Sequence, residues 1–214
     1  MEKLLLITRP EHDPGTLYLS KWSEKIIHEA RDRGVKVVDL YRKQAERNRF
    51  LGTIEKSNPK LIVLNGHGDE KTITGHDGKV ILAETDSHLI SGKIIFARAC
   101  KSARILGPAL VSGGAVAYLG YREDFWFKYS FKDIFRPLAD KTAALFLSPS
   151  NYLAISLLKG HPAGEANKKS KELYKKNIER LLAEGPVAED YDAIRLLFWN
   201  MINQVCIGDE NAAF

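Results

Sequence analysis

Short apolar runs recur along the first 120 residues, and polar segments with helical spacing lie between them. Such runs are typical of strands that are buried on both faces of a sheet. Strands that alternate with helices predict a mostly parallel sheet, and right-handed crossovers place helices on both of its sides. The chain is therefore expected to be an α/β protein, a three-layer sandwich with a mostly parallel central sheet of about five or six strands. The predicted strands are residues 4–8, 35–40, 60–65, 93–99 and 115–120.

The segments around these strands carry turn and helix signals. Thr16 follows a loop rich in proline and glycine, and we expect it to cap the first helix. Asp77-Gly78 between two β-prone runs predicts a hairpin over residues 72–82. Cys100 is expected to open the helix after the fourth strand, and the last helix is expected to dock its apolar stripe onto the sheet. The predicted helices after the first are residues 42–57, 101–112, 138–159, 165–183 and 188–206.

The length and composition suit one domain of a globular protein. The 214 residues are 44% hydrophobic and 28% charged, and no linker divides them. We expect a single domain, with residues 1–127 as the sheet core that carries the active site and residues 128–214 as its helical completion. The two cysteines are too few for a disulfide framework, and the apolar run near the N-terminus is too short to cross a membrane. These features favour a cytoplasmic, reducing location without membrane contact.

A net charge of +5 raises the question of nucleic-acid binding. Basic residues concentrate at 168–180, where Tyr174, Ile178 and Leu181 recur at helical spacing. This pattern is typical of an amphipathic helix whose other face is solvated. Because no aromatic platform or zinc spacing accompanies the basic residues, nucleic acid is not an expected partner.

Two residues with catalytic potential follow neighbouring predicted strands. His67 comes just after residues 60–65, and Cys100 comes just after residues 93–99. Ligands of open α/β sheets bind beyond the carboxyl ends of the strands, and an imidazole beside a cysteine favours the nucleophilic thiolate. The dipole of a helix that begins at Cys100 would act in the same direction. The amides of Gly68 and Cys100 are candidates for an oxyanion hole. The alternative interpretation is a buried thiol and a turn histidine.

The ordered motifs around these residues resemble the caspase-like cysteine peptidases, and most closely their CHAT and gingipain-like branch. NGHG at 65–68 and ARACKSA at 97–103 are similar to the family's strand ends in His-Gly and Ala-Cys. The resemblance covers roughly residues 60–180. It continues through HDGKVILAETDSHLISGKIIFARACKSA, LVSGGAVAYLGYREDFW and SNYLAISLLKGHPAGEANKKSKELY.

The resemblance implies a caspase-like fold and a cysteine endopeptidase with a His67–Cys100 dyad. Cys100 would attack the peptide carbonyl, His67 would protonate the leaving amine, and the Gly68 and Cys100 amides would hold the oxyanion. The resemblance implies no cofactor and no metal. The substrate would be a peptide or protein that lies extended along the sheet edge. Members of this branch often act as effectors, which an activating subunit or self-assembly switches on.

Two other functions remain open from the sequence. Many members of the superfamily have lost the dyad, so a catalytically silent interaction or scaffold module is the main alternative. A flavodoxin-like domain that binds a small ligand is a further alternative. RPEHDPGT after the first strand is a poor match to the phosphate-binding glycines that such a domain would need.

Arg98 bears on the preference for the P1 residue, which precedes the scissile bond. Side chains two positions apart on a strand face the same way, so Arg98 is expected on the side of Cys100. In the family, this position lines the P1 pocket, and an arginine there would favour an acidic P1 residue. The alternative is that Arg98 pairs internally with Glu123 or Asp124, in a loop expected to border the pocket. Unpaired, those two acids would favour a basic P1 residue.

The remaining histidines and the second cysteine give weaker signals. His12 and Asp13 follow the first strand and are candidates for lining the site, although a turn explains them as well. Cys206 falls beside the apolar stripe of the last helix, where packing is its expected role. Surface positions are expected for His76, His88 and His161.

Overall fold

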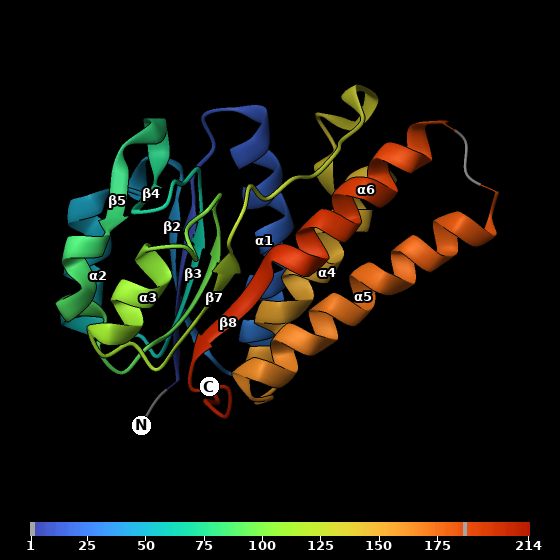
Figure 1. Ribbon diagram of the computed structural model, residues 1–214. Helices are drawn as coiled ribbons and strands as arrows, with labels where there is room; N and C mark the ends of the chain where they lie inside the picture. The colour runs from blue at the N-terminus through green and yellow to red at the C-terminus, as the bar shows by residue number, and fades with distance from the viewer. Residues whose placement is uncertain (1–2, 186–187) are drawn as a thin grey trace.

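Six strands form the main sheet of the computed structural model, which describes residues 3–185 and 188–214 (Figure 1). The strand order is β2-β1-β3-β6-β7-β8; β8 is antiparallel to β7 and all other neighbours are parallel. The mostly parallel sheet of about five or six strands is therefore confirmed. A two-stranded antiparallel hairpin, β4-β5, lies outside it. The strands are β1 (Leu4–Arg9), β2 (Lys36–Tyr41), β3 (Leu61–Asn65), β4 (Thr72–Thr74), β5 (Val80–Ala83), β6 (Ile94–Arg98), β7 (Ala117–Tyr121) and β8 (Gln204–Gly208).

The helices connect these strands and extend the C-terminal half. The α-helices are α1 (Pro14–Asp32), α2 (Arg47–Ser57), α3 (Leu106–Ser112), α4 (Lys141–Leu158), α5 (Ala163–Ala183) and α6 (Ala188–Asn203). The short 3₁₀ helices are η1 (Arg42–Gln44), η2 (His76–Gly78), η3 (Glu84–Ile90), η4 (Phe131–Asp133) and η5 (Pro137–Ala139). The basic segment 168–180 lies on α5, whose Tyr174 is buried. None of the helices in the described residues has the length and apolarity that a membrane span requires.

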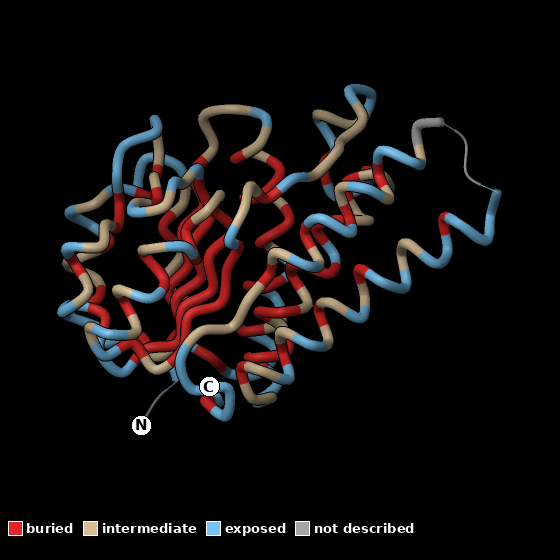
Figure 2. The backbone as a smooth tube through the Cα atoms, in the orientation of Figure 1, coloured by how far each residue is buried: buried red, intermediate tan, exposed pale blue. Residues whose placement is uncertain are grey.

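Alternate residues of each central strand pack into different helical layers. Leu61 and Val63 of β3 join the core that includes α1 and α4, whereas Ile62 and Leu64 join the core that includes α2 and α3. The period of two along a strand thus divides the apolar residues between the two faces. Figure 1 shows α1 and α4 on one side of the sheet and α2 and α3 on the other, and Figure 2 shows the strands between them buried.

The strand order places the functional loops together. The chain crosses from β1 to β2 at one side and then returns past β1 to β3, so the order reverses between β1 and β3. In open α/β sheets, such a reversal opens a crevice at the carboxyl ends of the strands. The loops after β1, β3 and β6 leave the sheet at this edge, and they carry Asp13, His67 and Cys100 respectively.

The C-terminal segment differs from the sequence prediction. The last helix ends at Asn203, and Gln204–Gly208 forms β8 at the sheet edge. Helix α6 packs against α4 and α5 rather than onto the sheet, through Ala193 and Leu197. The apolar stripe was ambiguous because Val205 and Ile207 also suit a strand, and pairing with β7 satisfies their backbone groups.

Candidate active site

Cys100 lies on a sharp turn just beyond the end of β6. The next residue, Lys101, has a φ of 55°, which is unfavourable for a residue with a side chain. Its amide donates to the Glu123 carbonyl at 3.1 Å, which ties the turn to the loop after β7. Helix α3 begins only at Leu106, so the expectation that Cys100 opens this helix was wrong. The tight turn, rather than a helix dipole, sets the position of the thiol.

His67 lies in the loop after β3, beside Cys100. The two strands are parallel neighbours, with Asn65 paired to Arg98. A Cβ atom on Gly68 would lie 2.8 Å from Cβ of Ala99 and 3.0 Å from the Cys100 carbonyl oxygen. Only glycine therefore allows the His67–Gly68 backbone to approach the nucleophile turn this closely.

A small pocket of about 80 Å³ has both His67 and Cys100 in its wall. Its other lining residues are Gly15, Thr16, Leu19, Gly66, Arg98, Ala99, Phe125 and Phe127. The described residues include no hydrogen bond between the histidine and the cysteine, since Nε2 of His67 bonds to Asp13 instead. His67 and Cys100 thus line one pocket, without a hydrogen bond between the thiol and the imidazole.

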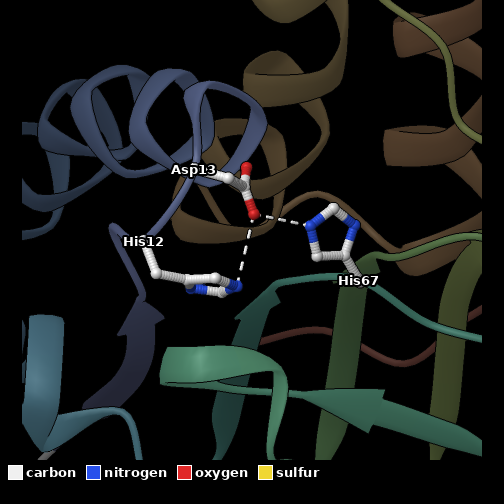
Figure 3. Close-up of side chains that lie close together, drawn as sticks. All are labelled: His12, Asp13 and His67. Carbon is white, nitrogen blue, oxygen red and sulfur yellow. Dashed lines mark hydrogen bonds and ion pairs between the residues drawn. The ribbon is translucent and has the colours of Figure 1, made fainter.

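Asp13 is the residue that links the first helix to the candidate base. It is the N-cap of α1, where its Oδ1 accepts a hydrogen bond from the Thr16 amide at 2.8 Å. Its Oδ2 lies 2.7 Å from Nε2 of His67 (Figure 3). Thr16 was expected as the cap and is instead the third residue of the capping box. The sequence signal was present, since Asp before Pro is a strong helix start, but nothing in it pointed to His67.

The Asp13 contact fixes the tautomer of His67. Burial opposes ionisation of Asp13, but hydrogen bonds from Thr16 and His67 outweigh it, so the pKa of Asp13 lies below its ordinary value. An ionised carboxylate only accepts hydrogen bonds, so Nε2 of His67 carries the proton. Nδ1, on the side of the ring away from Asp13 in Figure 3, is then free to accept one. His67 is therefore arranged as a base: Asp13 binds its Nε2, and its Nδ1 can accept a proton.

The thiol of Cys100 is held in its neutral form. Burial raises the pKa of Cys100, and the negative charge of Asp124 adds to this effect. A hydrogen bond from the Phe125 amide and the charge of Lys101 act in the opposite direction and are outweighed. The sequence-based expectation of a helix-stabilised thiolate therefore does not hold for this structure.

The two amides expected to form an oxyanion hole are unused in the described part of the chain. Gly68 and Ile73 face each other as a non-hydrogen-bonded antiparallel pair, because the flanking bonds run from Asp69 to Thr72 and from Thr74 to His67. Neither the Gly68 amide nor the Cys100 amide donates to another group there. Both amides are thus left available as donors, and of the two residues Cys100 lines the pocket.

Arg98 is completely buried and is one of the residues that line the pocket. Its guanidinium donates to Oδ1 of Asn65 at 2.7 Å, to Oδ1 of Asn151 at 2.7 Å and to Oγ of Ser23 at 2.5 Å. Burial lowers its pKa to about 10, so the group is still charged at neutral pH. The partners are all neutral, and the alternative pairing with Glu123 or Asp124 is not present.

Glu123 and Asp124 have other cationic partners. Glu123 pairs with Arg104, which also binds Glu70. Asp124 lies 3.6 Å from Nζ of Lys101 and next to the thiol of Cys100. Asp124 thus lies beside the thiol, both acids have cationic neighbours, and neither is among the residues that line the pocket.

The other histidines are placed in two groups. His88 is exposed, and His161 is partly exposed, within reach of Glu165 and Lys169. His12 and His76, by contrast, pack edge to face with ring centroids 5.6 Å apart, near Asp13. Cys206 is half-buried on β8, and its pKa is raised to about 11 by burial and nearby acids.

Comparison with known proteins shows what the fold is like. The chain matches the structure of the Arg-specific cysteine proteinase gingipain R (RgpB), with a TM-score of 0.64 and 14% identity over 98% of this chain and 46% of that chain. The complex of the pro- and mature domains of RgpB from Porphyromonas gingivalis matches with a TM-score of 0.61 and 13% identity, over 98% and 47% of the chains. The chain thus spans about half the length of these solved structures.

The structural comparison finds similar proteins, whereas the sequence comparisons find none. No protein-family model matches the sequence, and no curated protein matches it. At 13–14% identity, the similarity to gingipain is one of architecture. The chain therefore has an α/β fold similar to the caspase-like fold of gingipain.

Proposed function

We propose that this protein is a cysteine endopeptidase in which Cys100 is the nucleophile and His67 is the acid–base group. The observation that carries the proposal is the single pocket lined by both residues, at the carboxyl ends of adjacent parallel strands. Two unused amides and a histidine held by a carboxylate accompany it. Nucleophile, base and orienting group are the arrangement that covalent peptide hydrolysis requires.

The proposed reaction follows from the positions of the groups. Nδ1 of His67 takes the proton of the Cys100 thiol as Sγ attacks the carbonyl carbon of the substrate. The amides of Gly68 and Cys100 donate hydrogen bonds to the oxyanion. These bonds stabilise the negative charge that develops on the carbonyl oxygen in the tetrahedral intermediate. Asp13 stabilises the imidazolium that forms. His67 then protonates the leaving amine, and water hydrolyses the thioester.

The pocket also supports an acidic P1 residue. Its volume of about 80 Å³ is near half that of the ~150 Å³ cavity known to bind benzene, so it accepts a short side chain rather than an arginine. Arg98 in its wall is a buried cation with neutral partners, whereas Glu123 and Asp124 are paired with cations. A carboxylate in this pocket would offset the uncompensated charge.

We further propose that activation by a partner or by self-assembly precedes turnover. In this structure the thiol is neutral, and the described residues include no hydrogen bond between it and His67. Apolar side chains near the β7 loop and along α6 are exposed, among them Trp126, Phe198 and Ile202. Such a surface fits a protein contact that would move the loop carrying Asp124. Labelling of the isolated chain that rises with its concentration would support self-assembly, and labelling at a rate independent of concentration would contradict the need for activation.

Labelling with peptidyl acyloxymethyl ketones that carry Asp or Arg at P1 tests the proposed function. Wild type, Cys100→Ala, His67→Ala and Cys206→Ala are compared by intact mass. We expect one adduct with the Asp probe, lost in Cys100→Ala, weakened in His67→Ala and retained in Cys206→Ala. An adduct that survives Cys100→Ala would overturn the dyad. The absence of any adduct at every chain concentration would favour the scaffold alternative.

A further inference from the structure

Three side chains from separate segments converge behind the candidate base. His12 comes from the loop after β1, Asp13 from the start of α1 and His67 from the loop after β3 (Figure 3). Nε2 of His12 lies 3.2 Å from Oδ2 of Asp13, and Nε2 of His67 lies 2.7 Å from the same oxygen. One nitrogen or oxygen from each residue lies within 4.8 Å of the others. The arrangement is a closed triangle of two imidazoles and one carboxylate.

Two of the three residues are held in place by the fold. Asp13 is fixed by the helix cap, and the His12 amide donates to Oγ1 of Thr16 at 3.1 Å. The His12 ring packs against His76, and its Nδ1 is buried without a hydrogen-bond partner in the described part of the chain. Only Nε2 of His12 is therefore free to act, and it faces Asp13. His67 is more mobile in principle, because 59% of its side chain is exposed.

The chemistry and the spacing suit Zn²⁺. Two imidazole nitrogens and a carboxylate oxygen are ligands of this ion, and three protein ligands leave one position open. Tetrahedral ligands at about 2.0–2.1 Å from zinc lie roughly 3.3 Å from each other. The 3.2 Å between Nε2 of His12 and Oδ2 of Asp13 is close to this value. The 2.7 Å between Asp13 and His67 would have to lengthen, and the exposed side chain of His67 leaves room for that movement. An ionised Asp13 also gives the triangle a net negative charge.

We propose that His12, Asp13 and His67 bind Zn²⁺ and that the bound ion prevents His67 from acting as a base. The inhibition, but not the binding, rests on the proposed function. For zinc to take the lone pair of Nε2, the single ring proton of neutral His67 would move from Nε2 to Nδ1 by exchange with solvent. A metal-bound ring that is protonated on Nδ1 has no lone pair for the Cys100 proton. The ion would thus hold the enzyme inactive without touching the thiol.

The ligand set distinguishes this site from zinc held by the dyad itself. If zinc bound to His67 and the Cys100 thiolate, it would need Cys100 and would not need His12. If it binds as proposed, it needs His12 and does not need Cys100. The variants His12→Gln and Cys100→Ala therefore give opposite results under the two arrangements. His28→Gln, at an exposed position of α1, is a control for unspecific histidine binding.

Zinc binding to the full chain is measured by isothermal titration, with Co²⁺ absorption as a report on coordination. We expect one ion per chain in wild type, Cys100→Ala and His28→Gln, and affinity weakened by about tenfold or more in His12→Gln. Binding that is lost in Cys100→Ala, or unchanged in His12→Gln, would overturn the site.

A second measurement tests the inhibition. The rate of Cys100 labelling by the Asp probe is measured with and without Zn²⁺. For each variant, the rate with zinc is divided by the rate of the same variant without zinc. Zinc should slow labelling in wild type and His28→Gln and have little effect in His12→Gln. Zinc that binds but leaves wild-type labelling unchanged would refute the inhibition. If no variant is labelled at all while the binding results hold, the proposed function fails and the metal site stands.

Discussion

Oδ2 of Asp13 lies 2.7 Å from Nε2 of His67, while Oδ1 of the same carboxylate caps helix α1. One side chain thus starts the first helix and holds the candidate base. Because Asp13 is fixed by the capping box, the orientation of His67 depends on a rigid element rather than on its own exposed loop. The contact therefore connects the loop after β1, which starts helix α1, with the loop after β3, which carries the candidate base.

Asp13→Asn should slow catalysis without loosening the helix. Asn is also a good N-cap, so the thermal midpoint should change little. The amide cannot hold the Nε2 proton of His67 as a carboxylate does, so the maximal rate of labelling should fall by about 10²-fold, within the roughly 10²–10⁴-fold that a positioned base contributes. The apparent affinity for the probe should be unchanged. A fall in affinity with an unchanged maximal rate would assign Asp13 to substrate binding instead.

Gly68→Ala should impair the site through sterics. The added Cβ would meet Cβ of Ala99 at 2.8 Å and the Cys100 carbonyl oxygen at 3.0 Å, which forces the two loops apart. We expect labelling to drop by about tenfold or more, since losing one oxyanion donor typically costs about 10²–10³-fold. Gly52→Ala in α2 is the matched control, because its Cβ meets nothing within 4 Å. That variant should keep full labelling and gain about 0.5–1 kcal/mol of stability. Equal labelling in the two variants would contradict the close approach.

The reactivity of Cys100 should rise only at a pH above the ordinary pKa of cysteine. Burial favours the neutral thiol, so the folded-state pKa of Cys100 lies above the ordinary cysteine value. Alkylation by iodoacetamide in a Cys206→Ala background should therefore increase with pH and reach half its maximum above that value. A midpoint at or below the ordinary cysteine pKa would show an activated thiolate in the free chain, contrary to this structure.

Arg98 should contribute to stability as well as to the pocket. Arg98→Met leaves Oδ1 of Asn65 and Oδ1 of Asn151 without their buried donors. We expect a loss of about 2–4 kcal/mol in the free energy of unfolding, because each unsatisfied buried group costs about 1–3 kcal/mol. Arg33→Met removes an exposed helix pair with Glu29 and should cost only about 0.3–0.5 kcal/mol. Urea denaturation gives both values, and similar midpoints for the two variants would contradict the internal role of Arg98.

Much of the fold could be predicted from the sequence, because strands buried on both faces leave continuous apolar runs. β8 could not, since Val205 continues a helical stripe and its segment becomes a strand only because β7 offers an unpaired edge. The placement of His67 beside Cys100 followed from motif order. The contact of Asp13 with His67 did not, because it joins residues 54 positions apart through the helix cap. The internal partners of Arg98 come from α1 and α4 and leave no local sequence pattern.

Cleavage of a peptide library tests the central claim most directly. Wild type and Cys100→Ala are incubated with the library at high chain concentration, and the new termini are identified by mass spectrometry. Cys100→Ala should be stable enough for the comparison, since the described residues include no hydrogen bond between the thiol and His67. We expect new termini after acidic residues with wild type and none with Cys100→Ala. New termini of equal abundance with both proteins, or none with wild type under conditions in which the Asp probe labels Cys100, would contradict a peptidase built on Cys100 and His67.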